Sequence, residues 1–218
     1  MARQAGFTLV EVLVWTVLSA VVLGAAYSVY RMQAREFKVQ ENRLEAQEYA
    51  QAVIELMVRE IRNAGSLPAG ACTTTPANTK GIVTADIQTF RLVYDSNADT
   101  DCADADENIT YAFDNTDCPT GYGNIKRNGE PLTDCNVPEG SANFSFTYYP
   151  KDCTVSFSPP VGSGTEACQA GNAGTLAAIR RVEIKLTVKS KNPDPVFGGQ
   201  LTTTMTSNAD LRNSGLAS

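Results

Sequence analysis

Hydrophobic residues are concentrated near the start of the chain, where residues 7–30 form an apolar run with one charged side chain, Glu11. These 24 residues would extend over roughly 36 Å as a helix, which is enough to cross a bilayer. A secretory signal peptide would have a shorter apolar core followed by a cleavage site between small residues, and no such site follows this run. The pattern therefore predicts a membrane-spanning helix that continues into the next segment.

After Arg31 the pattern becomes amphipathic. Apolar side chains recur at helical spacing among Arg, Glu and Gln residues, at Leu44, Ala46, Ala50, Val53, Ile54, Met57 and Ile61. No proline precedes Pro68, and the sequence Asn63-Ala64-Gly65 is typical of a helix end. We therefore expect one helix from about Phe7 to about Asn63, whose second half packs on the domain that follows.

The rest of the chain alternates apolar and polar residues in short segments, as half-buried strands do. The clearest segment is 178–189, in which Val182, Ile184, Leu186 and Val188 alternate with polar or charged residues. Similar alternation marks segments 90–94, 109–113, 144–148 and 201–207, and Asn128-Gly129 marks a hairpin turn. Strands joined by short turns after one helix predict an α+β fold, in which an antiparallel sheet packs on the helix.

Composition narrows the classes of function. The 218 residues include 18 Lys and Arg against 24 Asp and Glu, a net charge of −6, so we expect no nucleic-acid partner. The chain has no histidine, which excludes His-based acid–base catalysis, Ser-His-Asp nucleophiles and imidazole metal sites. We therefore expect that the protein is not an enzyme.

All six cysteines lie after residue 70 and none forms a C-x-x-C pair, which is typical of disulfides in an oxidising compartment. The expected strand around residues 108–113 extends roughly 20 Å between Cys102 and Cys118, too far for a disulfide between them. The expected hairpin instead brings Cys118 to Cys135. The predicted pairs are Cys72–Cys102, Cys118–Cys135 and Cys153–Cys168.

An acidic segment, residues 95–107, has side-chain oxygens at a spacing like that of an EF-hand calcium loop. The candidate ligands are Asp95, Asn97, Asp99, Asp101 and Asp106. Against this, Thr100 stands where an EF-hand has glycine, and Asp106 is shorter than the usual glutamate. A solvated acidic loop between two strands is the alternative. Apart from calcium here, we expect no cofactor.

The string Gly6-Phe7-Thr8-Leu9-Val10-Glu11, after a short leader with one basic residue, resembles the processing site of type IV prepilins and type II secretion pseudopilins. The resemblance implies that a prepilin peptidase cuts between Gly6 and Phe7 and that the new N-terminal Phe7 is methylated. Glu11 would be the fifth residue of the mature chain, where the family has a glutamate that pairs with the N-terminus of an adjacent subunit. A reason for this carboxylate is needed, because a charge inside an apolar span costs about 2.5–3.5 kcal/mol on insertion scales.

A looser similarity links the chain to minor pilins of the PilW kind and to J-type pseudopilins. It rests on the segment Glu-Asn-Ile-Thr-Tyr at residues 107–111, the strand at 181–189 and the run Leu-Arg-Asn at 211–213. It implies a type IV pilin-like fold divided into a leader peptide (1–6), a transmembrane half-helix (7–30), an amphipathic half-helix (31–64) and a disulfide-containing β-rich domain (65–218).

The function implied by this resemblance is that of a minor pilin, which helps to initiate assembly of a type IV pilus and is incorporated into it. A J-type type II secretion pseudopilin and a filament-borne adhesin are the alternatives. The implied partners are other minor and major pilins, contacted through the helix, and the prepilin peptidase. The implied location is the bacterial inner membrane, crossed once with the C-terminal domain in the periplasm, and then the extracellular pilus.

Overall fold

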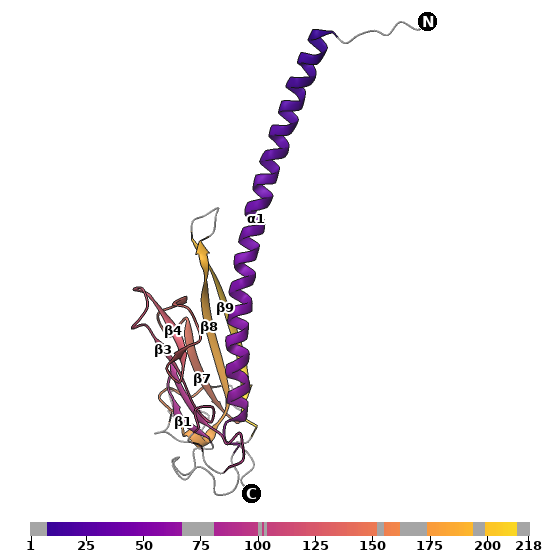
Figure 1. Ribbon diagram of the computed structural model, residues 1–218. Helices are drawn as coiled ribbons and strands as arrows, with labels where there is room; N and C mark the ends of the chain where they lie inside the picture. Colours follow the sequence, from indigo (N-terminus) through magenta and orange to yellow (C-terminus); the bar gives the residue numbers. More distant parts are fainter. Residues whose placement is uncertain are drawn as a thin grey trace.

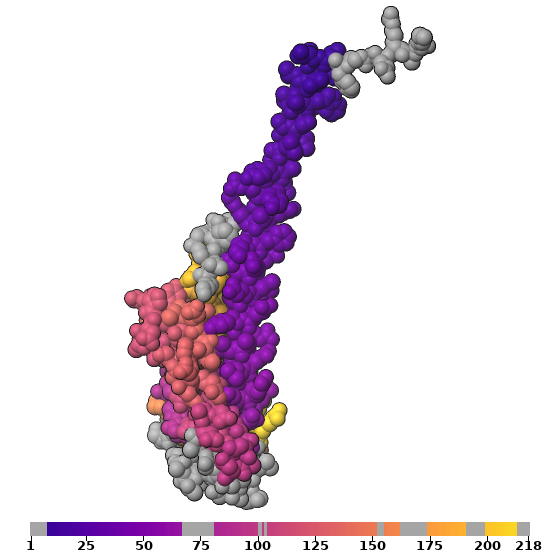
Figure 2. Space-filling model, in the orientation of Figure 1, coloured from indigo at the N-terminus to yellow at the C-terminus, as the bar shows by residue number. Residues whose placement is uncertain are grey.

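The computed structural model describes residues 8–66, 81–99, 102, 104–151, 155–161, 174–193 and 199–212. One long helix, α1 (Leu9–Asn63), leads into a β-rich domain that lies against its C-terminal half (Figure 1). The N-terminal half of α1 extends well beyond the domain (Figure 2). With 55 residues, α1 is about 82 Å long. The single continuous helix expected from the sequence is confirmed to within two residues at its start.

Six strands form the first sheet. They are β1 (Ile82–Ala85), β2 (Thr89–Val93), β3 (Asn108–Asp114), β4 (Tyr122–Arg127), β5 (Glu130–Pro131) and β6 (Val137–Pro138). The order is β1-β2-β3-β4-β5, with β6 paired to β4, and every pairing is antiparallel. Asn128 and Gly129 join β4 to β5 with φ angles of 51° and 87°, the left-handed conformations that a two-residue hairpin turn requires. The predicted hairpin is therefore confirmed.

The second sheet has three antiparallel strands in the order β7-β8-β9. Their bounds are β7 (Phe144–Pro150), β8 (Ile179–Pro193) and β9 (Gln200–Asp210), and a short 3-10 helix, η1 (Leu176–Ala178), precedes β8. Helix α1 packs mainly on β8 and β9. The predicted α+β fold, with antiparallel strands packed on the long helix, is confirmed. Its strands form two sheets and not one, because β7 pairs with β8 and not with the strands that precede it.

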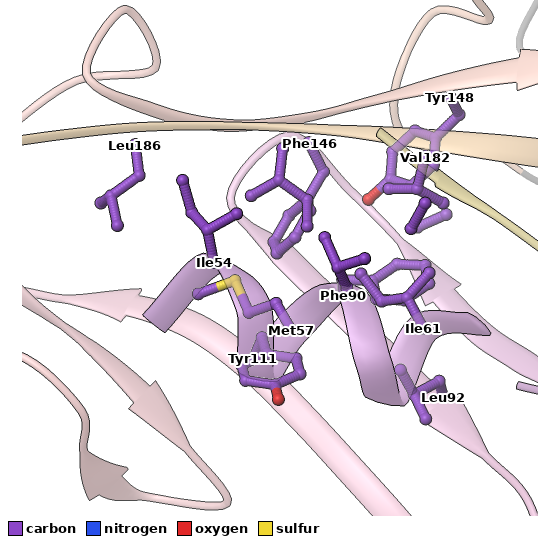
Figure 3. Packing of buried hydrophobic residues seen from close by; sticks show 14 of the residues in the cluster. Ile54, Met57, Ile61, Phe90, Leu92, Tyr111, Phe146, Tyr148, Val182 and Leu186 are labelled. Atoms are coloured by element: carbon purple, nitrogen blue, oxygen red, sulfur yellow. The ribbon is translucent and has the colours of Figure 1, made fainter. Parts of the chain in front are cut away.

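The hydrophobic core fills the space between α1 and the two sheets (Figure 3). The ring of Phe90 from β2 lies 5.4 Å from that of Phe146 and 5.8 Å from that of Tyr148, both from β7, so aromatic contacts join the two sheets. Residues of α1 that were expected to be buried are buried, at Ala46, Ala50, Val53, Ile54, Met57 and Ile61. Leu44 is the exception, with 56% of its surface exposed, because the helix turns Asn42 and Ala46 toward the domain instead.

One charged residue of α1, Glu60, lies in this core and is 7% exposed. Its carboxylate accepts hydrogen bonds from Nη2 of Arg127 at 2.9 Å and from Nε at 3.1 Å. The hydroxyl of Tyr111 donates to the other carboxylate oxygen. Burial raises the pKa of the Tyr111 phenol, and the hydrogen bond to Glu60 raises it further. A polar cluster therefore ties the helix to β3 and β4.

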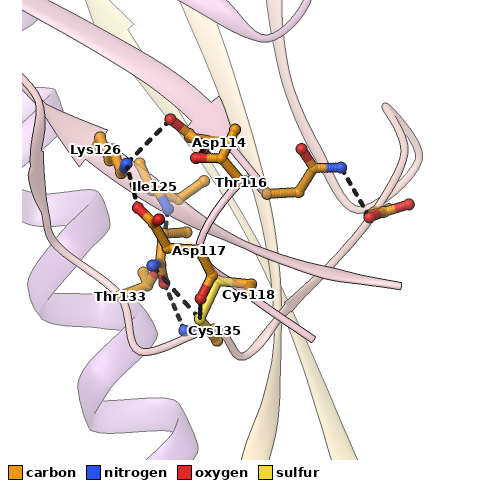
Figure 4. The surroundings of a disulfide bond; sticks show 11 residues. Asp114, Thr116, Asp117, Cys118, Ile125, Lys126, Thr133 and Cys135 are labelled. Carbon is orange, nitrogen blue, oxygen red and sulfur yellow. Dashed lines mark hydrogen bonds and ion pairs between the residues drawn. A yellow bond between two sulfur atoms is a disulfide. The ribbon is translucent and has the colours of Figure 1, made fainter. Parts of the chain in front are cut away.

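The predicted Cys118–Cys135 disulfide is confirmed, with the two Cα atoms 5.3 Å apart (Figure 4). Beside it, Lys126 forms ion pairs with Asp114 at 3.0 Å and with Asp117 at 3.3 Å. Cys102 is also disulfide-bonded. The other cysteines, at positions 72, 153 and 168, lie outside the described residues, so the two remaining pairings stay predictions.

The end of α1 leads directly to the edge of the first sheet. The backbone N–H of Gly65 donates to the carbonyl of Val93 at 3.0 Å, and that of Asp95 donates to the carbonyl of Ser66 at 2.9 Å. A Cβ atom on Gly81 would lie 1.9 Å from the backbone nitrogen of Gly65. This close approach of the segment before β1 to the helix end requires glycine at position 81. The two hydrogen bonds fix the end of β2 and the loop after it against the same point.

Candidate functional site

The first candidate site is the N-terminal half of α1. Its large apolar side chains are exposed, with exposed fractions from 49% for Val14 to 80% for Leu9. The helix is long and apolar enough to cross a membrane, by length and composition. An exposed apolar surface of this size marks a segment that is covered by lipid or by another protein.

The exposed apolar surface continues past the expected membrane half. Leu23, Tyr30, Phe37 and Leu44 follow one another at intervals of seven residues, and all four are more than half exposed. Residues seven apart lie nearly on one line along a helix, and such a line is the usual seam of helix–helix packing. This apolar seam, defined by these four residues, runs from the protruding half of α1 to the part that packs on the domain.

Glu11 lies close to the helix start, at the third position of α1. The backbone N–H of Glu11 donates to Oγ1 of Thr8 at 3.3 Å, so Thr8 caps the helix. The carboxylate is therefore placed in the first turn, where the partial positive charge of a helix N-terminus favours an anion. Along the described helix, the first basic residue after Glu11 is Arg31, about 30 Å away.

This cap was not among the features inferred from the sequence, although its signal is there. A threonine followed three residues later by a glutamate, as in Thr8-Leu-Val-Glu11, is typical of a helix N-terminus. The two residues of the expected cleavage site, Gly6 and Phe7, lie outside the described residues. Processing at that site stays a prediction.

The second candidate site is the acidic loop between β2 and β3. Carboxylate oxygens of Asp95, Asp99 and Glu107 lie within 4.8 Å of one another. Ala98, with a φ of 63°, lies at the bend of the loop, and its backbone N–H donates to Oδ1 of Asp95 at 2.6 Å. Glu107 has no exposed surface, and its Oε1 accepts from the backbone N–H of Ser96 at 2.9 Å. The loop thus brings three of its acidic side chains close together.

The structure brings together only part of the ligand set expected from the sequence. Asp95 and Asp99 lie in the group, whereas Asp106 is exposed and outside it, and Asp101 is not among the described residues. The amide nitrogen of Asn97 donates to Asp99 at 2.9 Å, and its oxygen accepts from the Asp99 backbone at 2.9 Å, so this side chain braces the loop.

Glu107 was missed as a member of this group because the EF-hand spacing favoured the neighbouring Asp106. The strand pattern nevertheless contained a signal for it. Glu107 is in phase with Ile109 and Tyr111, and both of these side chains are fully buried in β3. The alternation that predicted the strand therefore also places the Glu107 carboxylate on the buried face.

Comparison with known proteins bears on the first site. Residues 1–27 match the family model of the prokaryotic N-terminal methylation motif. No curated protein and no solved structure matches the chain. The motif and the long apolar helix that carries it are consistent with a type IV pilin-like protein, and they support the class of type IV pilins and pseudopilins.

Proposed function

We propose that this protein is a minor pilin, which helps to start assembly of a type IV pilus and becomes part of the filament. The observation that carries the proposal is the methylation motif at the start of a helix whose apolar half is not buried by the described part of its own domain. Such a surface is covered by lipid before assembly and by helices of other pilins after it. The role is structural and not enzymatic.

The apolar seam supports contact between subunits as well as membrane anchoring. Leu44 lies 35 residues after Leu9, about 52 Å farther along the helix axis, which exceeds the roughly 30 Å of a bilayer core. If Leu9 lies at one face of the bilayer core, Phe37 and Leu44 lie beyond the other face, where acyl chains do not cover them. The helices of other minor and major pilins are the partners that we assign to them.

The processing step gives a first test. When the chain is produced with a prepilin peptidase, N-terminal sequencing and mass spectrometry should find a chain that begins at an N-methylated Phe7. Gly6→Leu should leave the full-length precursor in the membrane. Gly24→Ala is the matched control, since a Cβ atom at Gly24 meets no other atom within 4 Å. Normal processing of Gly6→Leu would refute the assignment to this class.

A J-type pseudopilin of a type II secretion system and a filament-borne adhesin are the alternatives. Deleting the gene separates them, because the three roles affect different outputs. We expect surface pili to fall in number while type II secretion continues. Loss of secretion with normal pili would favour the pseudopilin. Normal pili and secretion with loss of attachment would favour the adhesin.

A further inference from the structure

The carboxylate of Glu107 is in an unusual position for a charged group. It has no exposed surface, and it lies beside two other carboxylates, those of Asp95 and Asp99. Burying a charge is costly unless a partner compensates for it. Three carboxylates that are close together also repel one another, and a cation bound between them removes that repulsion.

Only one of the two carboxylate oxygens of Glu107 accepts hydrogen bonds from the described residues. Oε1 accepts from the backbone N–H of Ser96 at 2.9 Å and from its hydroxyl at 3.2 Å. Oε2 is buried and has no hydrogen-bond partner among the described residues. Buried polar atoms of this kind are rare in folded proteins, and a bound ion is one of the established reasons for them.

From these two observations we infer that the acidic loop is a calcium-binding site, with Asp95, Asp99 and Glu107 as its carboxylate ligands. This set differs from the EF-hand register, because Glu107 replaces Asp106. The inference does not depend on the proposed role in a pilus.

The chemistry of the ligands suits calcium better than magnesium. Calcium binds oxygen at about 2.3–2.6 Å in a flexible geometry, so two ligands on opposite sides of the ion are roughly 4.6–5.2 Å apart. Magnesium demands near-ideal octahedral geometry and usually keeps several of its waters. Carboxylate oxygens that all lie within 4.8 Å of one another can therefore share one calcium ion. Asp99 is exposed, which leaves a path for the ion and room for water to complete six to eight ligands.

The site would connect three parts of the fold. Asp95 follows β2 and its backbone is bonded to Ser66 at the end of α1, whereas Glu107 directly precedes β3. An ion held by both residues would fasten the loop between the strands to the end of the helix. Calcium binding should therefore stabilise the domain, because a ligand that binds only the folded state shifts the unfolding equilibrium by mass action.

The test uses the full chain in detergent micelles, stripped of divalent ions with a chelator. Calcium is titrated by calorimetry, and thermal unfolding is followed at constant ionic strength with CaCl₂, with MgCl₂ or with NaCl alone. We expect a Kd of about 10⁻³ M or lower, as in extracellular calcium modules. We also expect the melting temperature to rise by several degrees with calcium, and clearly less with magnesium.

The variants locate the site. Glu107→Gln keeps the shape of the side chain and an oxygen for Ser96, so without calcium it should be at least as stable as the wild type. With calcium it should lose the rise in melting temperature, and its affinity should fall at least about tenfold. Should Glu107→Gln not fold, Asp99→Asn, at an exposed position, provides the same test. Asp106→Asn and Glu130→Gln are the matched controls and should respond to calcium like the wild type.

Three outcomes would overturn the inference. The first is no calcium-dependent change in heat or melting temperature in the wild type. The second is a wild-type response in Glu107→Gln or Asp99→Asn, which would place the ion elsewhere. The third is loss of the response in Asp106→Asn with retention in Glu107→Gln, which would restore the EF-hand register.

Discussion

Glu60 on α1 and Arg127 at the end of β4 form an ion pair in which Nη2 and Nε of the guanidinium both reach the carboxylate, at 2.9 and 3.1 Å from Oε1. The side chains are only 10% and 24% exposed, so water screens the pair little. The helix is thus held to the second sheet by apolar packing and to the first sheet by charge as well.

Removing one member of this pair should destabilise the domain strongly. We expect Arg127→Met to lower the free energy of unfolding by about 2–4 kcal/mol, because it leaves the buried Glu60 carboxylate without its cation. The double variant Glu60→Met/Arg127→Met should recover much of this loss, since it removes both charges. Urea unfolding of the full chain, followed by near-ultraviolet circular dichroism, measures both effects.

The control for this experiment is an exposed ion pair on the same helix. Lys38 and Glu41 lie 2.8 Å apart with 52% and 68% of their side chains exposed. Lys38→Met should therefore leave the free energy of unfolding nearly unchanged. An equally small effect of Arg127→Met would show that the buried pair does not stabilise the attachment of the helix.

Tyr111 should make stability depend on alkaline pH. Burial and the hydrogen bond to Glu60 hold the pKa of its phenol above the ordinary value of 10.0. A raised pKa in the folded state adds stability that is complete below about pH 10 and is lost as pH rises toward the folded-state pKa. Between pH 10 and 11, the free energy of unfolding should fall with pH in both proteins. The slope should be smaller for Tyr111→Phe than for the wild type, by about 1 kcal/mol per pH unit.

The measurement for Tyr111 is the denaturant midpoint at a series of alkaline pH values. Tyr149→Phe is a suitable control, because Tyr149 is partly exposed and its ring, which stacks on Arg181 at 4.3 Å, is retained. Identical pH slopes for the wild type and Tyr111→Phe would contradict the expectation. Burial also raises the pKa of Tyr148, so this residue contributes to the pH slope in every variant. For that reason each variant is compared with the wild type.

The Cys118–Cys135 disulfide closes a segment with a sequence separation of 17. A cross-link of this length is expected to add about 3 kcal/mol to stability, chiefly by restricting the unfolded chain. Replacing both cysteines by alanine should lower the urea midpoint accordingly, without leaving a free thiol that could form a wrong disulfide. If the free energy of unfolding changes by less than about 1 kcal/mol, the backbone hydrogen bonds of β4 maintain the local structure without the disulfide.

Glu11→Val tests the carboxylate at the start of α1. The variant should be processed and inserted normally, since valine removes the cost of a charge in the apolar span. Recovery of partner pilins from membranes should fall roughly tenfold, which corresponds to a loss of about 1.4 kcal/mol of interaction. Glu36→Val, an exposed position farther along the same helix, is the matched control. Equal recovery with Glu11→Val would show that the carboxylate has no part in assembly.

Local periodicity predicted the elements that are long and regular. The helix was clear because its apolar positions repeat over many turns, and β8 was clear because its residues alternate from Val182 to Val188. Strand β1 was not foreseen, because its burial pattern, with Ile82 and Ala85 buried and two half-buried residues between them, has no alternation to recognise. The division into two sheets depends on which distant strands pair, and a pattern within one strand does not determine that.

The polar residues of the interior were harder to foresee. A glutamate on an amphipathic helix is usually solvated, yet Glu60 lies next to Ile61 and one turn after Met57, on the face that packs. Its partner Arg127 comes from a strand 67 residues later. No local pattern joins two such residues. The same is true of Glu107, whose burial is indicated by strand phase but whose neighbours Asp95 and Asp99 are brought to it by the path of the loop.

The long exposed surface of α1 has a consequence for the energetics of the proposed transfer from membrane to filament. When an apolar helix moves from lipid acyl chains into a bundle of apolar helices, its surroundings are apolar both before and after. The hydrophobic effect therefore contributes little to the free energy of extraction from the bilayer. Glu11 is different, because its carboxylate is poorly solvated by lipid and gains wherever a cation is available. A single acidic side chain can therefore favour release from the bilayer, whereas the apolar residues around it contribute little to the free energy of the transfer.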